Sequence, residues 1–150
     1  MSTDDTLSRL RAIEDTLAIQ RLKAAFTGFL DAGNWEQMGK LLSEDAVAEF
    51  PQGTFTGRKE IVKIISSGVF SFTMHFLCNP IIEVRNNEAT GSWYVLCAAT
   101  DGSTQEAFWI LGRYNDLYVK RENEWKIGRI TFKLVVSAPY HQDWAQVKAE

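Results

Sequence analysis

Apolar residues near the start of the chain recur at helical spacing. From Thr6 to Leu30 they fall mostly three or four residues apart, as one face of a helix requires. Gly33 is placed to end this helix in the left-handed conformation that glycine tolerates. Asn34 can then cap a second helix, which we expect to run through Leu42.

A short strand and a third helix are predicted next. Ala46–Phe50 has the composition of a strand, and Pro51 stops it because proline cannot donate to a ladder. After Gly57, four closely spaced aliphatic residues give Arg58–Ser67 the broad apolar face of a short helix. They are Ile61, Val62, Ile64 and Ile65.

The remainder of the chain has the composition of β-strands. Four long segments are rich in β-branched and aromatic residues: Phe70–Arg85, Ala89–Thr100, Gln105–Lys120 and Trp125–Val136. The pairs between them are compatible with tight hairpins, Asp101-Gly102 most clearly. The order predicts an antiparallel meander preceded by three helices, which is an α+β architecture.

These strands lack the alternation of a sheet with one wet face. In Trp93–Cys97 and in Phe108–Leu111, residues of both parities are apolar. Such a sheet needs cover on both faces, and three helices can cover only one. We therefore expect a homo-oligomer in which a second copy covers the outer face.

Length and charge narrow the class of protein. With 150 residues, 45% of them hydrophobic and 23% charged, the chain is expected to form a single domain over residues 1–150. The net charge of -3 and the scattered Lys and Arg residues argue against nucleic-acid binding. No run approaches the ~20 apolar residues that span a membrane, and the N-terminus carries acids where a signal peptide carries cations. We expect a soluble, cytoplasmic protein.

The sequence predicts neither a metal nor a cofactor. The two histidines are far apart, and Cys78 and Cys97 lie in apolar segments without the spacing of a metal or redox site. Both cysteines are expected to be buried hydrophobes. A glycine-rich phosphate loop is also missing from the sequence.

His75 and Asp31 are the strongest candidates for chemistry. His75 lies in a predicted strand, and imidazole titrates near neutral pH. Asp31 falls near the end of the first helix, where the helix dipole disfavours a negative charge. This unfavourable placement favours a functional role for Asp31 over a purely structural one. The pattern leaves two positions open for His75. It either faces solvent or points inward, with Phe72 and Phe76 meeting another subunit.

Four short segments together resemble the SnoaL-like branch of the nuclear transport factor 2-like superfamily, over roughly residues 7 to 136. They are Ala25–Asn34, Leu41–Val47, Gly112–Tyr118 and Trp125–Arg129. The resemblance implies a cone, in which N-terminal helices pack into a curved, mostly antiparallel sheet and leave a pocket at the wide end. It also implies a dimer or a trimer.

The resemblance assigns Asp31 and His75 to a catalytic dyad like that of the dehydrochlorinase and dehydratase members. His75 would be a general base and Asp31 would fix its tautomer. The chain is then expected to be a cofactor-independent lyase or isomerase acting on a small hydrophobic molecule. Residues expected to contact that molecule are Phe26, Phe29, Trp93, Phe108, Tyr114 and Arg129.

Phe26 keeps two alternatives open. Active members often carry a polar group five residues before the aspartate, and here the position is apolar. The chain is therefore either an enzyme or a non-catalytic binding protein of the same fold. A third possibility is a polyketide-cyclase-like or ketosteroid-isomerase-like enzyme, in which a carboxylate is the base. The fold by itself does not decide among them.

Overall fold

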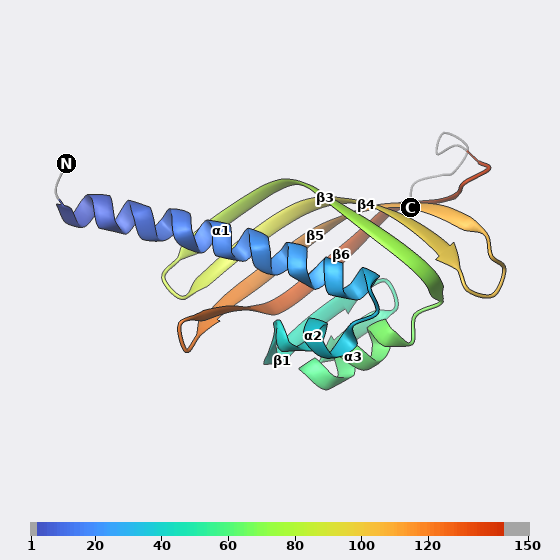
Figure 1. The fold of residues 1–150 in the computed structure, drawn as a ribbon, viewed down its shortest axis with the longest axis horizontal. Coiled ribbons are helices and arrows are strands. Elements are labelled where there is room, and N and C mark those ends of the chain that lie inside the picture. The colour runs from blue at the N-terminus through green and yellow to red at the C-terminus, as the bar shows by residue number, and fades with distance from the viewer. Residues whose placement is uncertain (1–2, 143–150) are drawn as a thin grey trace.

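The computed structural model describes residues 3–142, which form three helices and six strands (Figure 1). In chain order the elements are α1 (Thr3–Asp31), α2 (Trp35–Lys40), β1 (Leu42–Phe50), β2 (Gly53–Thr56), α3 (Arg58–Ser66), β3 (Phe70–Arg85), β4 (Glu88–Asp101), β5 (Ala107–Arg121) and β6 (Glu124–Pro139). The long helix, the third helix and the four long strands agree with their predicted bounds to within three residues.

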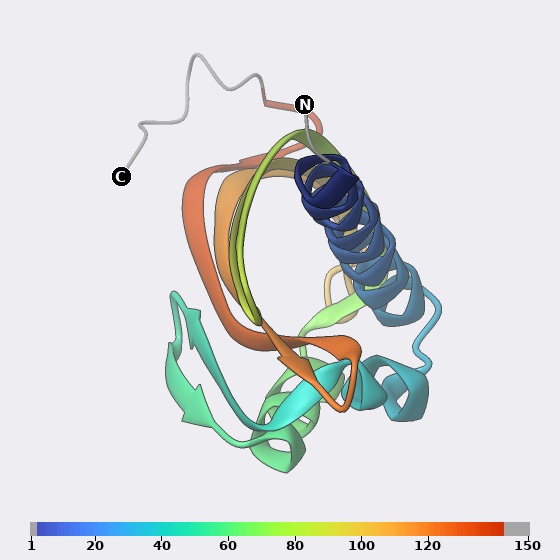
Figure 2. The same ribbon diagram turned by 90° about the vertical axis from the view of Figure 1, so that its left-hand side faces the viewer.

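All six strands join one sheet in the order β2-β1-β6-β5-β4-β3. Strands β3 to β6 form the predicted antiparallel meander. Strand β1 pairs with the edge of β6 that faces away from β5, and runs parallel to it. The sheet curves strongly, and α1 lies across its concave side (Figure 2). The predicted α+β cone, with N-terminal helices packed into a curved, mostly antiparallel sheet, is therefore confirmed.

The second helix and the strands that follow it differ from the prediction, and β1 begins at Leu42 rather than at Ala46. The second helix ends at Lys40 rather than Leu42, because Leu42 enters the parallel ladder opposite Ile127. The sequence also gave no sign of β2, which pairs with β1 across the turn at Pro51 and Gln52. The predicted cap is confirmed, since the side chain of Asn34 accepts a hydrogen bond from the backbone of Gln37.

Asp101-Gly102 is not the tight hairpin that we predicted. A longer loop separates β4 from β5, because the Asp101 carboxylate accepts hydrogen bonds from the backbone of Ser103 and Thr104. Such a local turn competes with direct strand pairing. The two-residue connection at Glu122 and Asn123 is a true tight turn, with both residues at positive φ, as a type I′ hairpin requires.

Helix α1 is attached to the sheet by acidic side chains at two levels. Near its middle, Asp15 Oδ1 lies 2.8 Å from both Lys120 Nζ and Trp125 Nε1, which come from β5 and β6. At its last residue, Asp31 bonds to β3. Between these levels the helix buries Ile19, Leu22 and Phe26 against the concave face of the sheet. These attachments place the end of α1 over β3, where the candidate site lies.

The outer face of the sheet is apolar and uncovered in the single chain. Phe72, Met74 and Phe76 of β3 are all exposed, as are Tyr94 and Leu96 of β4. Cys78 shares their side of β3 and is exposed too, which corrects the prediction that both cysteines are buried. The oligomer inferred from these two-faced strands stays a prediction.

In the part of the chain that the structure describes, no helix is both long and apolar enough to cross a membrane.

Candidate active site

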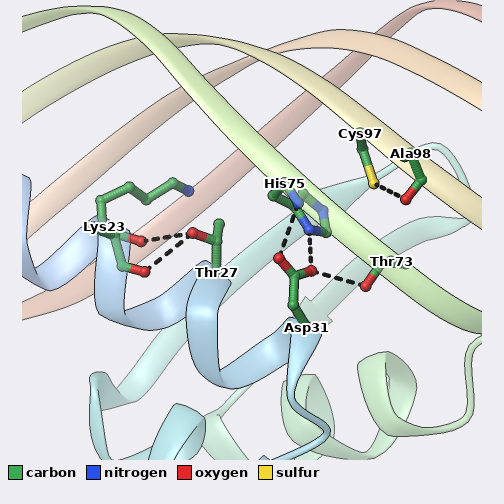
Figure 3. Close-up of polar contacts among 8 residues, drawn as sticks. Lys23, Thr27, Asp31, Thr73, His75, Cys97 and Ala98 are labelled. Atoms are coloured by element: carbon green, nitrogen blue, oxygen red, sulfur yellow. Dashed lines mark hydrogen bonds and ion pairs between the residues drawn. The ribbon is translucent and has the colours of Figure 1, made fainter.

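Asp31 and His75, 44 residues apart in the chain, are in direct contact (Figure 3). Asp31 Oδ1 lies 2.6 Å from His75 Nδ1, and Oδ2 accepts a hydrogen bond of 2.9 Å from the His75 backbone N–H. The Thr73 hydroxyl donates to Asp31 Oδ1 at 2.8 Å. Three hydrogen bonds thus fix the carboxylate against one short stretch of β3.

Alternation along β3 explains this placement. Thr73, His75 and Leu77 face the interior, while Phe72, Met74 and Phe76, which alternate with them, face out. The His75 side chain is 10% exposed and that of Asp31 is 21% exposed. Of the two positions left open by the sequence pattern, the structure therefore shows the inward one.

The dyad is an ion pair at neutral pH. Burial of the ring disfavours its protonation, but the hydrogen bond with Asp31 and the contact with Cys97 outweigh burial and raise the pKa of His75 to about 9. For Asp31, burial opposes ionisation, but the hydrogen bonds from His75 and Thr73 hold the pKa below its usual value. Because Asp31 occupies Nδ1, Nε2 is the nitrogen left for proton exchange with a ligand.

His75 lines an apolar cavity of about 210 Å³ at the end of α1. The walls come from all three helices and from the inner faces of β3, β4, β5 and β6. The lining residues are Leu30, Trp35, Ile65, Gly68, Phe70, Thr73, His75, Val95, Cys97, Ile110, Tyr114 and Phe132. Since a cavity of about 150 Å³ accommodates benzene, this one has room for a substituted ring.

Of the residues predicted to contact a ligand, only Tyr114 lines this cavity. Phe26 and Trp93 are buried in the core, and Phe29 packs against that core from α1. Phe108 sits near the start of β5, between Ala99 and Pro139 in register. Phe26, Phe29 and Trp93 therefore support the fold around the cavity, and Phe108 does not line it either.

Arg129, which was also predicted to contact a ligand, lies away from the cavity. It is paired with Glu49 of β1, and the Thr131 hydroxyl donates to the same carboxylate at 2.7 Å. The register shifts at Gly128, so Ile127 faces inward before the shift and Ile130 after it. A one-residue bulge reverses the face on which each following side chain lies. It turns Arg129 to the outer face, away from the cavity.

Most residues of the cavity wall were not predicted from the sequence, because their positions depend on strand register. Cys97 and Ile110 reach the cavity because they lie level with His75 across β4 and β5. A sequence pattern does not show such levels. Thr73 did carry a usable signal, since it lies two residues before His75 and must therefore share its face.

A second polar cluster lies deeper in the cone and was also missed. Lys23 Nζ is 2.8 Å from Asp116 Oδ2, and both side chains are 0% exposed. The Tyr118 hydroxyl donates to Asp116 at 3.0 Å and accepts a hydrogen bond from Trp93 Nε1 at 3.1 Å. Burial lowers the pKa of Lys23 and raises that of Asp116, while the pairing opposes both shifts.

A sequence signal for this cluster existed. Lys23 stands eight residues before Asp31, so the two side chains lie on one face of α1, with Thr27 between them (Figure 3). Asp116 alternates with Tyr114 and Tyr118 on the inner face of β5. A lysine and an aspartate on buried faces must be paired or neutralised.

Among residues 3–142, no three His, Cys, Asp or Glu side chains come together as ligands for a metal ion would.

Solved structures share this fold across most of the chain. A provisionally assigned scytalone dehydratase from Novosphingobium aromaticivorans is 27% identical, with a TM-score of 0.74 over 95% of this chain and 94% of its own. The hexachlorocyclohexane dehydrochlorinase LinA-type3 from Novosphingobium barchaimii is 18% identical, with a TM-score of 0.83 over 90% and 96%. A provisionally assigned dehydratase of the NTF2-like family from Streptomyces avermitilis is 14% identical, with a TM-score of 0.74 over 83% and 99%.

The sequence itself points to the same family. No functionally curated protein matches the chain by sequence. The model of the SnoaL-like domain, however, matches residues 11–131, which include α1 from its first third onward, both residues of the dyad and most of the sheet. With its cone fold and its dehydratase and dehydrochlorinase neighbours, the chain belongs to the SnoaL-like domain family of the NTF2-like superfamily.

Proposed function

We propose that the chain is a cofactor-independent lyase or isomerase, in which His75 removes a proton from a small hydrophobic molecule. The observation that carries the proposal is the 2.6 Å contact between Asp31 and a histidine that lines an apolar cavity. An apolar cavity with a few convergent polar groups is the usual form of a small-molecule site. The dehydratase and dehydrochlorinase neighbours are consistent with this reaction class.

The reaction needs only a proton transfer. Neutral His75 takes a proton from a substrate carbon through Nε2, and the freed electron pair forms a double bond while a leaving group departs, or moves onto a carbonyl oxygen. Asp31 holds Nδ1–H, so the tautomer is set, and its charge stabilises the imidazolium that forms. The proton on His75 then returns to the product or to water.

The activity is expected to rise with pH. Because the pKa of His75 is raised to about 9, only about one percent of the free protein carries the neutral base at pH 7. We expect kcat/KM to increase about tenfold per pH unit below this value and to level off above it. The profile is measured from initial rates in overlapping buffers. A kcat/KM that falls between pH 7 and 9 would contradict this assignment.

The reaction class can be tested with the substrates of the structural relatives. The protein is incubated with scytalone and, separately, with hexachlorocyclohexane, and the loss of water or of hydrogen chloride is followed by mass spectrometry. We expect elimination from at least one of the two, and much slower elimination with His75→Ala. Saturable binding of both compounds without turnover would instead support the binding protein.

One observation favours that second function, a non-catalytic small-molecule-binding protein. The imidazolium of His75 is the resting form at neutral pH, and it is a hydrogen-bond donor rather than a base. Phe26 adds no polar group to the site from α1. A binding protein would show the same affinity for its ligand at all pH values well below the His75 pKa of about 9, since His75 stays protonated there.

A homo-oligomer is part of the proposal, because a second copy of the chain would bury the exposed apolar face of β3 and β4. We expect light scattering to give a dimer or a trimer of the 17.0 kDa chain. Met74→Lys, in the middle of that face, should weaken assembly because it places a charge in an apolar interface. Lys63→Met, on α3, is a control for the change of charge. A monodisperse wild-type monomer would disprove the assembly.

A further inference from the structure

Tyr114 presents an unused hydrogen-bond donor to the cavity. It lies on the inner face of β5, is 7% exposed and lines the same cavity as His75. Among residues 3–142, its hydroxyl has no hydrogen-bond partner, whereas buried Tyr118 on the same strand face has two. A buried tyrosine normally satisfies its hydroxyl. Since the Tyr114 oxygen is not among the buried side-chain atoms that lack a partner, the hydroxyl opens on the cavity, where a ligand can accept its hydrogen bond.

The ring that carries this hydroxyl is held from two sides. Lys23 Nζ lies 3.6 Å from the Tyr114 ring centroid, and the Phe132 ring packs at 5.1 Å between centroids. Lys23 cannot move away easily, because its ammonium is paired with buried Asp116. A cation is attracted to the face of an aromatic ring, so Lys23 helps to hold the Tyr114 ring in place.

The hydroxyl also keeps its proton. Burial, and then the negative charge of Asp116, raise the pKa of Tyr114, and smaller contributions come from Cys97 and Asp31. Tyr114 is consequently a donor over the whole pH range in which His75 changes its charge.

We propose that the Tyr114 hydroxyl donates a hydrogen bond to a substrate oxygen that becomes negative when His75 removes a proton. This assignment rests on the proposed function and names the substrate class: a small ring compound that carries a carbonyl or hydroxyl oxygen. Tyr114 keeps its own proton throughout, so it stabilises charge without transferring a group. Donors that meet developing charge in a dry site are among the largest contributions to catalysis.

This role explains the apolar residue at position 26. Phe26 is buried in the core and offers no donor from α1. The structure provides a donor from the opposite wall instead, at Tyr114 of β5. Lys23, three residues before Phe26, contacts the ring of that tyrosine and not the cavity itself. Tyr114 on the sheet thus supplies the polar group that active family members often carry on the first helix.

The test uses 4-nitrophenol, whose oxygen is negative when ionised and whose absorbance reports its charge. At about pH 8 the probe is ionised while His75 remains protonated. We expect wild-type protein to bind the phenolate and to lower its pKa. Tyr114→Phe should weaken phenolate binding by about tenfold and raise the pKa of the bound probe by about one unit, the usual effect of one hydrogen bond to a charged group.

Two controls isolate the hydroxyl. The neutral probe 4-nitroanisole has no ionisable oxygen, so its affinity should be the same in wild type and Tyr114→Phe. Tyr94→Phe removes an exposed hydroxyl from the outer face of β4 and should leave both affinities unchanged. Thermal melting checks that Tyr114→Phe remains folded, since phenylalanine keeps the ring against Lys23 and Phe132.

The outcomes separate this inference from the proposed function. If wild type does not bind the phenolate, or if Tyr114→Phe binds it as tightly, the donor assignment is overturned. If the phenolate effect is present but no elimination is found with either relative's substrate, Tyr114 is a donor to a bound anionic oxygen and the lyase or isomerase proposal fails. Hexachlorocyclohexane has no oxygen. The substrate class would be overturned if the protein eliminates hydrogen chloride from this compound equally well with and without Tyr114→Phe, and does not turn over scytalone.

Discussion

Replacing His75 by alanine is expected to lower kcat/KM by about 10²–10⁴-fold, the usual contribution of a positioned general base. The reason is that His75 lies on the cavity wall and its neutral form, which appears as the pH rises toward its pKa of about 9, is the proposed base. The measurement is the initial rate of elimination from whichever substrate proves active. The other histidine supplies a matched control, because His141 is exposed and lies beyond β6. His141→Ala should retain full activity.

Asp31→Asn distinguishes the two possible bases. If His75 is the base, the amide removes the charge that stabilises the imidazolium, so both the rate and the pKa of His75 fall. The plateau of the pH profile then begins at a lower pH. If Asp31 itself is the base, Asp31→Asn abolishes activity while His75→Ala has a mild effect. The latter pattern would favour the ketosteroid-isomerase-like alternative.

Removing the buried cation at Lys23 is expected to cost about 3–5 kcal/mol in the free energy of unfolding, because Asp116 is left charged and unpaired in the interior. The single variant is Lys23→Met, which keeps the length of the side chain. Urea denaturation monitored by tryptophan fluorescence measures the effect. A cost below about 1 kcal/mol would mean that the pair is neutral or hydrated in the folded protein.

The double variant Lys23→Met/Asp116→Asn should regain most of that loss. An asparagine oxygen still accepts the hydrogen bond from Tyr118, and no buried charge remains. Lys40→Met is the matched control, since it breaks an ion pair with Glu36 in which both side chains are exposed. It should change the stability little. A double variant as unstable as Lys23→Met would assign the loss to packing against Tyr114 rather than to charge.

Local patterns predicted most of the fold because each long element repeats its own period. The apolar spacing of α1 and the β-branched composition of β3 to β6 extend over many residues, so errors at the ends matter little. Predictions failed where a distant partner decides the outcome. Leu42 has an apolar side chain suited to a helix face, but its pairing with Ile127 makes it the first residue of a strand.

The dyad was predicted through the family resemblance, since Asp31 and His75 are linked by no local pattern. Register and bulges decided the other residues of the site. The bulge at Gly128 turned Arg129 outward, and the level of Cys97 with His75 brought a thiol to the cavity. Neither feature has a signature within a few residues of the chain.

The sequence by itself determined the order of the three helices and of every strand except β2, the acidic balance of the chain and the two residues of the candidate dyad. The tertiary structure alone decided which face of β3 carries His75 and that Lys23 meets Asp116 beneath Tyr114. The physical reason is one of range. Backbone preferences and hydrophobic spacing act between near neighbours in the chain, whereas a binding site depends on contacts between strands whose register is set only when the whole sheet forms.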